Sequence, residues 1–229
     1  MASKMKIRAI IFDLDNTLID FVKFKNACVR AAVDAMISEG LSVSKSEAIN
    51  IVFELYKEYG WDNQKIFDKF LKKTKGLVDY KLLATAITAY RREKTKHMKP
   101  YPNVVPTLKK LKSKGIKLAI LSDAPRLQAY IRLADLGLLD YFDPIVTLDD
   151  TGKRKPHPAP FKKILSELKL KPQEVLMVGD APQWDIKGAK QAGMKTCLAR
   201  YGLMPHTAAK KIKADYEIGD INQLLRIIK

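Results

Sequence analysis

The sequence predicts an α/β protein with a Rossmann-like parallel sheet core, helices on both faces of that sheet, and an inserted domain that resembles a four-helix bundle. Three observations support this fold class. One apolar strand opens the chain, a helical stretch without strands follows over residues 20–98, and strands then alternate with helices. Such alternation is typical of a parallel sheet that is covered on both faces.

The opening strand, Ile7–Phe12, ends in two carboxylates, Asp13 and Asp15, which are followed by Asn16 and Thr17. The continuous apolar run is typical of a buried strand. Aspartates are costly to bury unless they are paired or bind a metal. The two acids therefore indicate a functional site with a cation at the carboxyl end of this strand.

The stretch 20–98 has the periodicity of helices. Apolar residues recur three and four positions apart from Phe21 onward, and Gly40 ends this first helix. Ser44 and Glu47 predict the capping box of a second helix, and two further apolar runs predict a third and a fourth. Four helices with no strand between them predict a separate bundle.

From residue 103 onward, helices and strands alternate. The predicted elements are helix 103–114, strand 117–121, helix 125–135, strand 145–148, helix 159–169, strand 175–178, helix 183–192, strand 195–199, a short edge strand 216–218 and a last helix 221–228. The first strand of the sheet lies before the helical stretch and the others follow it. We therefore expect a core domain of residues 1–19 and 99–229, into which a helical domain of residues 20–98 is inserted.

Charge and composition limit the partners and the compartment. The chain has 42 Lys+Arg against 25 Asp+Glu, a formal net charge of +17. The lysines are spread in ones and twos, which favours a solvated surface over a nucleic-acid-binding patch. No apolar run approaches the roughly 20 residues of a membrane helix, and the basic start does not read as a secretory signal. Cys28 and Cys197 form no CxxC motif, so we expect reduced buried thiols, as in a cytoplasmic protein. We also expect a monomer or homodimer with no membrane or nucleic-acid partner.

Polar residues follow the predicted strands at the edge where parallel sheets bind ligands. Six of them would converge there: Asp13, Asp15, Ser122, Lys155, Asp180 and Asp185. Carboxylate oxygens suit a hard divalent cation such as Mg²⁺, and a hydroxyl with an ammonium suits phosphate oxygens. Ser122 alone could be a helix cap and Asp185 alone a first-turn acid. Their order on successive strand ends instead predicts a site for a cation and a phosphate.

These residues resemble the four motifs of the haloacid dehalogenase-like (HAD) hydrolase superfamily, in the group with a helical cap after the first motif. The motifs are DLDNT (13–17), LSD (121–123), KPHPAPF (155–161) and GDAPQWDI (179–186). The resemblance implies that Asp13 is the nucleophile and Asp15 the general acid/base. It also implies that Ser122 and Lys155 hold the phosphoryl oxygens, and that Thr17 is near the substrate and orients Asp15.

The same resemblance implies a Mg²⁺ cofactor. Its ligands would be Asp13, the backbone carbonyl of Asp15, and Asp180, with Asp185 supporting the metal site through water. The motifs depart from the commonest pattern at three positions, Asn16, Asp123 and His157. None of these departures removes a group that the chemistry needs, although Asp123 adds a negative charge.

The function implied is a Mg²⁺-dependent phosphatase that hydrolyses small phosphorylated metabolites through an aspartyl-phosphate. Asp15 would protonate the leaving oxygen, which requires its pKa to be raised in the first step. A sugar phosphate or a glyceraldehyde-3-phosphate-type substrate is expected. The alternatives are a phosphomutase of the same superfamily and a basic nucleic-acid-binding protein. In the cap, the candidates to face substrate are Phe21, Phe24, Lys25 and Trp61, against the alternative that they pack within the cap.

Overall fold

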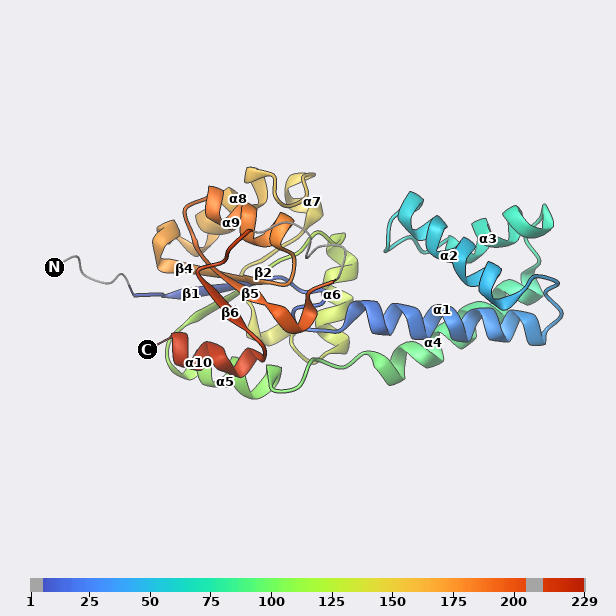
Figure 1. Ribbon diagram of the computed structural model, residues 1–229, viewed down its shortest axis with the longest axis horizontal. Coiled ribbons are helices and arrows are strands. Elements are labelled where there is room, and N and C mark those ends of the chain that lie inside the picture. Colours follow the sequence, from blue (N-terminus) through green and yellow to red (C-terminus); the bar gives the residue numbers. More distant parts are fainter. Residues whose placement is uncertain (1–5, 205–211, 229) are drawn as a thin grey trace. The chain divides into compact units, whose positions relative to one another are not determined.

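The computed structural model describes residues 6–204 and 212–228 (Figure 1). The chain divides into two compact units. One comprises Met1–Asp20 with Lys99–Lys229, and the other comprises Phe21–Met98. Among the described helices, none combines the length and the apolar character that crossing a membrane requires.

The first unit is built on a parallel sheet, which confirms the predicted fold class. Within the described residues the sheet has six strands, in the order β3-β2-β1-β4-β5-β6, and every neighbouring pair is parallel. The strands are β1 (Ala9–Phe12), β2 (Lys117–Leu121), β3 (Ile145–Val146), β4 (Val175–Gly179), β5 (Lys195–Ala199) and β6 (Tyr216–Ile218). All four residues of β1 are buried, because β1 lies in the middle of the sheet with helices on both faces.

The register brings the strand ends to one level. Phe12 pairs with Ile120 in β2 and with Val178 in β4. The residues that follow these three positions therefore leave the sheet at the same edge. The strand order also reverses between β1 and β4, so this edge is a topological switch point, where open parallel sheets bind ligands.

Helices cover both faces of the sheet (Figure 1), with α8 and α9 on one face and α5 and α10 on the other. The helices of this unit are α5 (Val104–Ser113), α6 (Arg126–Asp135), α7 (Leu148–Thr151), α8 (Pro158–Leu168), α9 (Lys187–Gln191) and α10 (Leu224–Ile227). Single turns are η1 (Leu139–Tyr141), η2 (Pro172–Glu174), η3 (Pro182–Ile186), η4 (Arg200–Gly202) and η5 (Ile221–Gln223). Alternate residues of β1, Ala9 and Ile11, pack with Phe161 of α8 and Ala189 of α9.

Three predicted boundaries were wrong. Leu148 does not end a strand but begins α7, because a capping box between Thr147 and Asp150 starts a helical turn there. The predicted helix 183–192 is a π-helical turn, η3, that runs into the short helix α9. The last predicted helix begins as a 3₁₀ turn, η5, before α10.

The second unit contains the four predicted helices. They are α1 (Phe21–Ser38), α2 (Lys45–Tyr59), α3 (Ile66–Lys75) and α4 (Tyr80–His97). The N-terminus of α2 is capped by Ser44, which accepts from the Glu47 backbone, and that of α4 is capped by Asp79. The apolar faces of the four helices share a buried core of their own.

Lys25 of α1 packs inside this helical unit. Its Nζ donates to Tyr90 Oη at 3.1 Å and lies 4.3 Å from the centroid of the Tyr56 ring. Trp61 stacks on Tyr56, with 5.8 Å between the centroids of the two rings. Phe21 and Phe24 are buried and contact each other. Each of these four residues thus has packing contacts within the helical unit.

Gly188 of α9 offers a test of the packing between α9 and α8. A Cβ at this position would overlap the buried Phe161 ring. We expect Gly188→Ala to lower the free energy of unfolding by about 1–2 kcal/mol, because overpacking of the core exceeds the gain in helix propensity. Urea unfolding measures this change. Gly219→Ala is the control, since a Cβ there has nothing within 4 Å; equal stability of the two variants would contradict the packing argument.

Candidate active site

A buried lysine joins two acids at the carboxyl end of β1. Lys155 Nζ donates to Asp13 Oδ1 at 2.6 Å, to Asp185 Oδ1 at 2.7 Å and to the Leu121 carbonyl at 3.0 Å. All three charged side chains are buried. Because an ammonium group has three hydrogens, these bonds use all of them and hold Nζ between the two carboxylates.

The π-helical turn η3 aims Asp185 at this lysine. Asp185 Oδ2 accepts from the Ala181 backbone at 3.0 Å, while Oδ1 accepts from Lys155. The last residue of β4, Gly179, lies directly beneath, and a Cβ there would overlap the Asp185 carboxylate. Single π turns occur often at functional sites. Here the turn and the glycine together let the carboxylate fold back onto its own loop.

The third acid, Asp180, is held by the loop after β1. Thr17 Oγ1 donates to Asp180 Oδ1 at 3.3 Å, and both side chains are buried. The sequence analysis placed Thr17 beside the substrate and Asp15. The structure shows a contact of its fully buried hydroxyl with Asp180, and the place of Thr17 beside the substrate stays a prediction.

Residues after β5 support the same loop from the other side. Tyr201 Oη donates to the Thr17 carbonyl at 2.9 Å. Gly202 lies against Asn16, and a Cβ at Gly202 would overlap the Asn16 carbonyl oxygen. Asn16 itself has φ of 61°, in the left-handed region that asparagine tolerates better than most residues. The short turn from Asp13 to Thr17 is thus fixed by contacts with β4 and with the end of β5.

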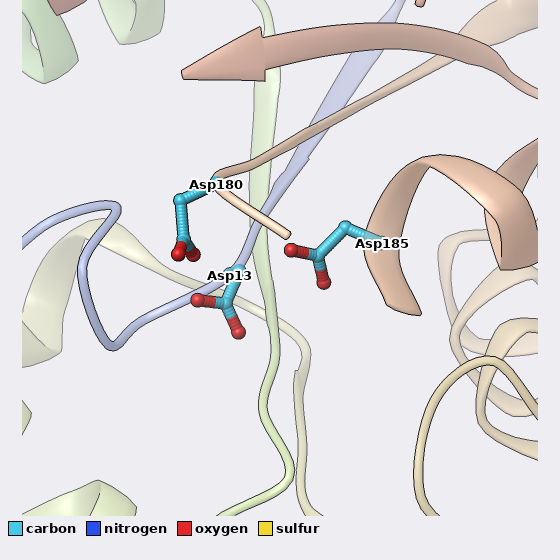
Figure 2. A group of neighbouring side chains, drawn as sticks. All are labelled: Asp13, Asp180 and Asp185. Atoms are coloured by element: carbon cyan, nitrogen blue, oxygen red, sulfur yellow. The ribbon is translucent and has the colours of Figure 1, made fainter. Parts of the chain in front are cut away.

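The three acids form a cluster suited to a cation. Figure 2 shows the carboxylates of Asp13, Asp180 and Asp185 turned toward one another. Each offers an oxygen, and these oxygens all lie within 4.8 Å of one another. Three carboxylates and one ammonium leave a formal excess of two negative charges. A hard divalent cation with oxygen ligands fits both the donor set and this charge.

Burial sets the protonation of the cluster. Burial raises the pKa of Asp13 to about 8, with Lys155 opposing the rise and Asp185 and Asp15 adding to it. Burial, Asp13 and Asp185 raise the pKa of Asp180 to about 9. Burial lowers the pKa of Lys155, but Asp13 and Asp185 outweigh it and hold that pKa well above its ordinary value. Lys155 therefore stays charged, while the acids need further positive charge to ionise fully.

Ser122 and Asp123 follow β2 at the same edge. Ser122 is buried, and its Oγ accepts from the Ala124 backbone at 3.2 Å, which leaves the hydroxyl hydrogen to donate. Asp123 Oδ1 accepts from the backbone of Lys155 at 3.0 Å, and the Asp123 carbonyl accepts from Arg154. The extra negative charge of this motif thus fixes the backbone that carries Lys155.

Asp15 lies beside an arginine that the sequence analysis did not identify. Arg132 Nη1 donates to Asp15 Oδ2 at 2.8 Å. The Arg132 side chain is 6% exposed and that of Asp15 is 26% exposed. Arg132 belongs to α6, the helix after β2, so Asp15 contacts a different partner from the three clustered acids.

The sequence contained signals for the residues that were missed. Arg132 stands within the apolar stripe of its helix, next to the buried Ala129 and Leu133. A charged residue on a buried face indicates a partner. Tyr201 and Gly202 directly follow β5, so they had to lie at the same edge of the sheet as the other strand ends.

The fold and the site together define a Rossmann-like enzyme core with an acidic, lysine-bridged centre. A family model described as haloacid dehalogenase-like hydrolase matches residues 10–199. The chain therefore belongs to the haloacid dehalogenase-like hydrolases, as its motifs predicted.

Individual relatives agree with this assignment. The chain is 35% identical over 223 residues to a glyceraldehyde 3-phosphate phosphatase of Methanocaldococcus jannaschii, covering 97% of both chains. It is 30% identical to the crystal structure of a HAD phosphatase from Thermococcus onnurineus, with a TM-score of 0.69 and coverage of 97% and 98%. A putative β-phosphoglucomutase from Thermotoga maritima, 22% identical, shares the fold with a TM-score of 0.75 and the same coverage.

Cation binding should depend on pH through the raised pKa values. Between 3.8, the ordinary pKa, and the raised values of about 8 and about 9, the folded protein holds protons on Asp13 and Asp180 that the unfolded chain releases. Without a divalent cation, this contribution to stability is lost as pH rises through that window. If Mg²⁺ is the cation of this site, it would bind the ionised acids, so we expect its stabilising effect to grow with pH and to reach about 5 °C in Tm near pH 9.

Thermal unfolding with Mg²⁺ or with EDTA, near pH 6 and near pH 9, measures this effect. Asp180→Asn should lose most of the Mg²⁺-dependent rise in Tm, because one ionisable oxygen donor is removed. The exposed Asp34→Asn is the matched control. A Mg²⁺ effect that is equal at both pH values would contradict the coupling.

Proposed function

We propose that this protein is a Mg²⁺-dependent phosphatase that hydrolyses phosphate monoesters of small metabolites, with Asp13 as the nucleophile. The observation that carries the proposal is the contact of Lys155 with both Asp13 and Asp185, beside Asp180. A buried carboxylate with an ammonium at 2.6 Å and two further acids within reach suits attack on a phosphate once a cation completes the charge balance.

Asp13 would attack phosphorus and form an aspartyl-phosphate, while the ester oxygen leaves. A carboxylate that approaches a phosphate dianion is repelled by it. Lys155 reduces that repulsion, because its ammonium stays charged and contacts the attacking carboxylate directly. The covalent step divides one difficult displacement into two easier ones.

The residues that would hold Mg²⁺ are Asp13, Asp180 and the backbone carbonyl of Asp15. Asp185 has both oxygens engaged, by Lys155 and by the Ala181 backbone, which supports an indirect role through water. When bound, the cation supplies positive charge to the phosphate oxygens. Thr17 would support this site by orienting Asp180.

Asp15 would act as general acid in the first step and as general base in the second. It would protonate the leaving oxygen, and then take a proton from the water that hydrolyses the aspartyl-phosphate. Its side chain is partly exposed and contacts Arg132 through Oδ2. Ser122 would donate its hydroxyl hydrogen to a phosphoryl oxygen, since its Oγ is already fixed as an acceptor.

The substrate class proposed is a triose phosphate of the glyceraldehyde 3-phosphate type. The support is the name of the Methanocaldococcus jannaschii relative, a glyceraldehyde 3-phosphate phosphatase, which is 35% identical over 97% of this chain. The small, doubly charged ester also suits a site that holds a buried ammonium and a buried hydroxyl, Lys155 and Ser122. The cytoplasm is the proposed compartment, where such metabolites are formed.

Phosphate release from 4-nitrophenyl phosphate with Mg²⁺ tests the nucleophile. We expect Asp13→Asn to lose about 1,000-fold or more in kcat, because no carboxylate can then form the covalent intermediate. Asp34→Asn, an exposed acid in the cap, is the control and should match the wild type. Full activity in Asp13→Asn would overturn the assignment.

Product analysis separates a phosphatase from a phosphomutase. With glyceraldehyde 3-phosphate we expect one phosphate released for each substrate consumed, because water accepts the phosphoryl group from Asp13. A mutase would interconvert isomers of a sugar phosphate and release little phosphate. Salt-sensitive binding of DNA that survives Asp13→Asn would instead favour the alternative of a basic nucleic-acid-binding protein.

A further inference from the structure

We propose that Arg132 is a positioning residue for Asp15, which fixes the orientation of the carboxylate that exchanges a proton with substrate and water. The inference rests on the proposed function, in which Asp15 is the general acid/base. Its basis is the ion pair from Arg132 Nη1 to Asp15 Oδ2 at 2.8 Å.

The arginine is held by the core and not by the loop that it supports. Its side chain is 6% exposed, and its helix α6 buries Ala129 and Leu133 against the core domain. The backbone at the start of α6 donates to Asp149 Oδ2 at 2.8 Å. A guanidinium fixed in this way is a preorganised partner for a carboxylate.

The chemistry of a guanidinium explains how it can orient the carboxylate. Arginine carries only donors and no acceptor, so its contact holds Asp15 Oδ2 as an acceptor. The ion pair also fixes the plane of the carboxylate, and misplacement of a catalytic group by about 1 Å can cost roughly 100-fold in rate.

Each of the four acids contacts a partner held by the core domain. Asp13 is held by Lys155, Asp180 by Thr17, and Asp185 by Lys155 and its own loop. The Asp15 side chain is 26% exposed, whereas Asp13 is buried. The partner of Asp15, Arg132, belongs to a helix, α6, whereas Lys155 and Thr17 lie in loops.

The experiment compares two substrates that need the acid to different degrees. A phosphate ester of an alcohol, such as glycerol phosphate, has a poor leaving group and requires protonation by Asp15. 4-Nitrophenyl phosphate has a good leaving group and requires almost none. General acid catalysis contributes about 100- to 10,000-fold, so the ratio of kcat/KM for the two substrates reports the function of Asp15.

We expect Arg132→Met to lower kcat/KM for glycerol phosphate by about 100-fold and for 4-nitrophenyl phosphate by less than about 5-fold. Arg132→Lys, which keeps a charge, should recover part of the ratio. In an Asp15→Asn background, Arg132→Met should add little further loss, because residues that act together are not additive. Arg126→Met removes an exposed ion pair of the same helix and should leave the ratio unchanged.

Equal losses on both substrates, or additive losses in the Asp15→Asn background, would overturn the inference and leave a structural role. If Arg132→Met does not fold, the ratio in Arg132→Lys decides, and an unchanged ratio there overturns the inference. Failure of the proposed function has a different signature. A wild type inactive on both substrates, or an active Asp13→Asn, would overturn the phosphatase itself and with it the role given to Arg132.

Discussion

The charge balance around Lys155 is the constraint on which the rest of the active site depends. Its ammonium is buried between Asp13 and Asp185 and is held by the Leu121 carbonyl as well. Burying an unpaired charge costs several kcal/mol, and the contacts of Lys155 with both acids reduce that cost. Even so, the cluster keeps a formal excess of negative charge, and burial raises the pKa of Asp13 and Asp180 accordingly. The centre by itself thus carries an excess of negative charge. It suits a divalent cation and a phosphate.

Around this centre each acid has its own support, and each support comes from a different element. Thr17 orients Asp180, the π turn η3 holds Asp185, and Arg132 of α6 contacts Asp15. The loop that carries Asp13 and Asp15 is itself fixed by Tyr201 after β5, which donates to the Thr17 carbonyl. Groups held by the scaffold need little reorganisation when charge moves during a reaction. The parallel sheet makes this possible because it delivers five chain segments to one edge.

The sequence was sufficient for the fold class because the signals were strong and local. The apolar run before Asp13 and the alternation after residue 103 fixed a parallel sheet with its ligand edge, and the structure brings Asp13, Lys155, Asp180 and Asp185 together there. What the sequence did not reveal was geometry that depends on tertiary contacts. The π turn at Asp185 exists because Gly179 leaves room beneath it, and Thr17 turns to Asp180 because Gly202 lets two loops approach. Neither contact leaves a trace in periodicity or composition.

The position of β1 in the middle of the sheet has a consequence for the making of the protein. β1 is the first strand to be synthesised, yet its neighbours begin at Lys117 and Val175. The partners Asp13 and Lys155 are 142 residues apart, a distance that protein synthesis covers in roughly 7–30 s at ordinary rates. During that time the helical unit Phe21–Met98 can fold, while strand β1 and the acids Asp13 and Asp15 still lack the other strands of the sheet. The helical unit is therefore complete in the synthesised chain before β1 has either of the strands with which it pairs.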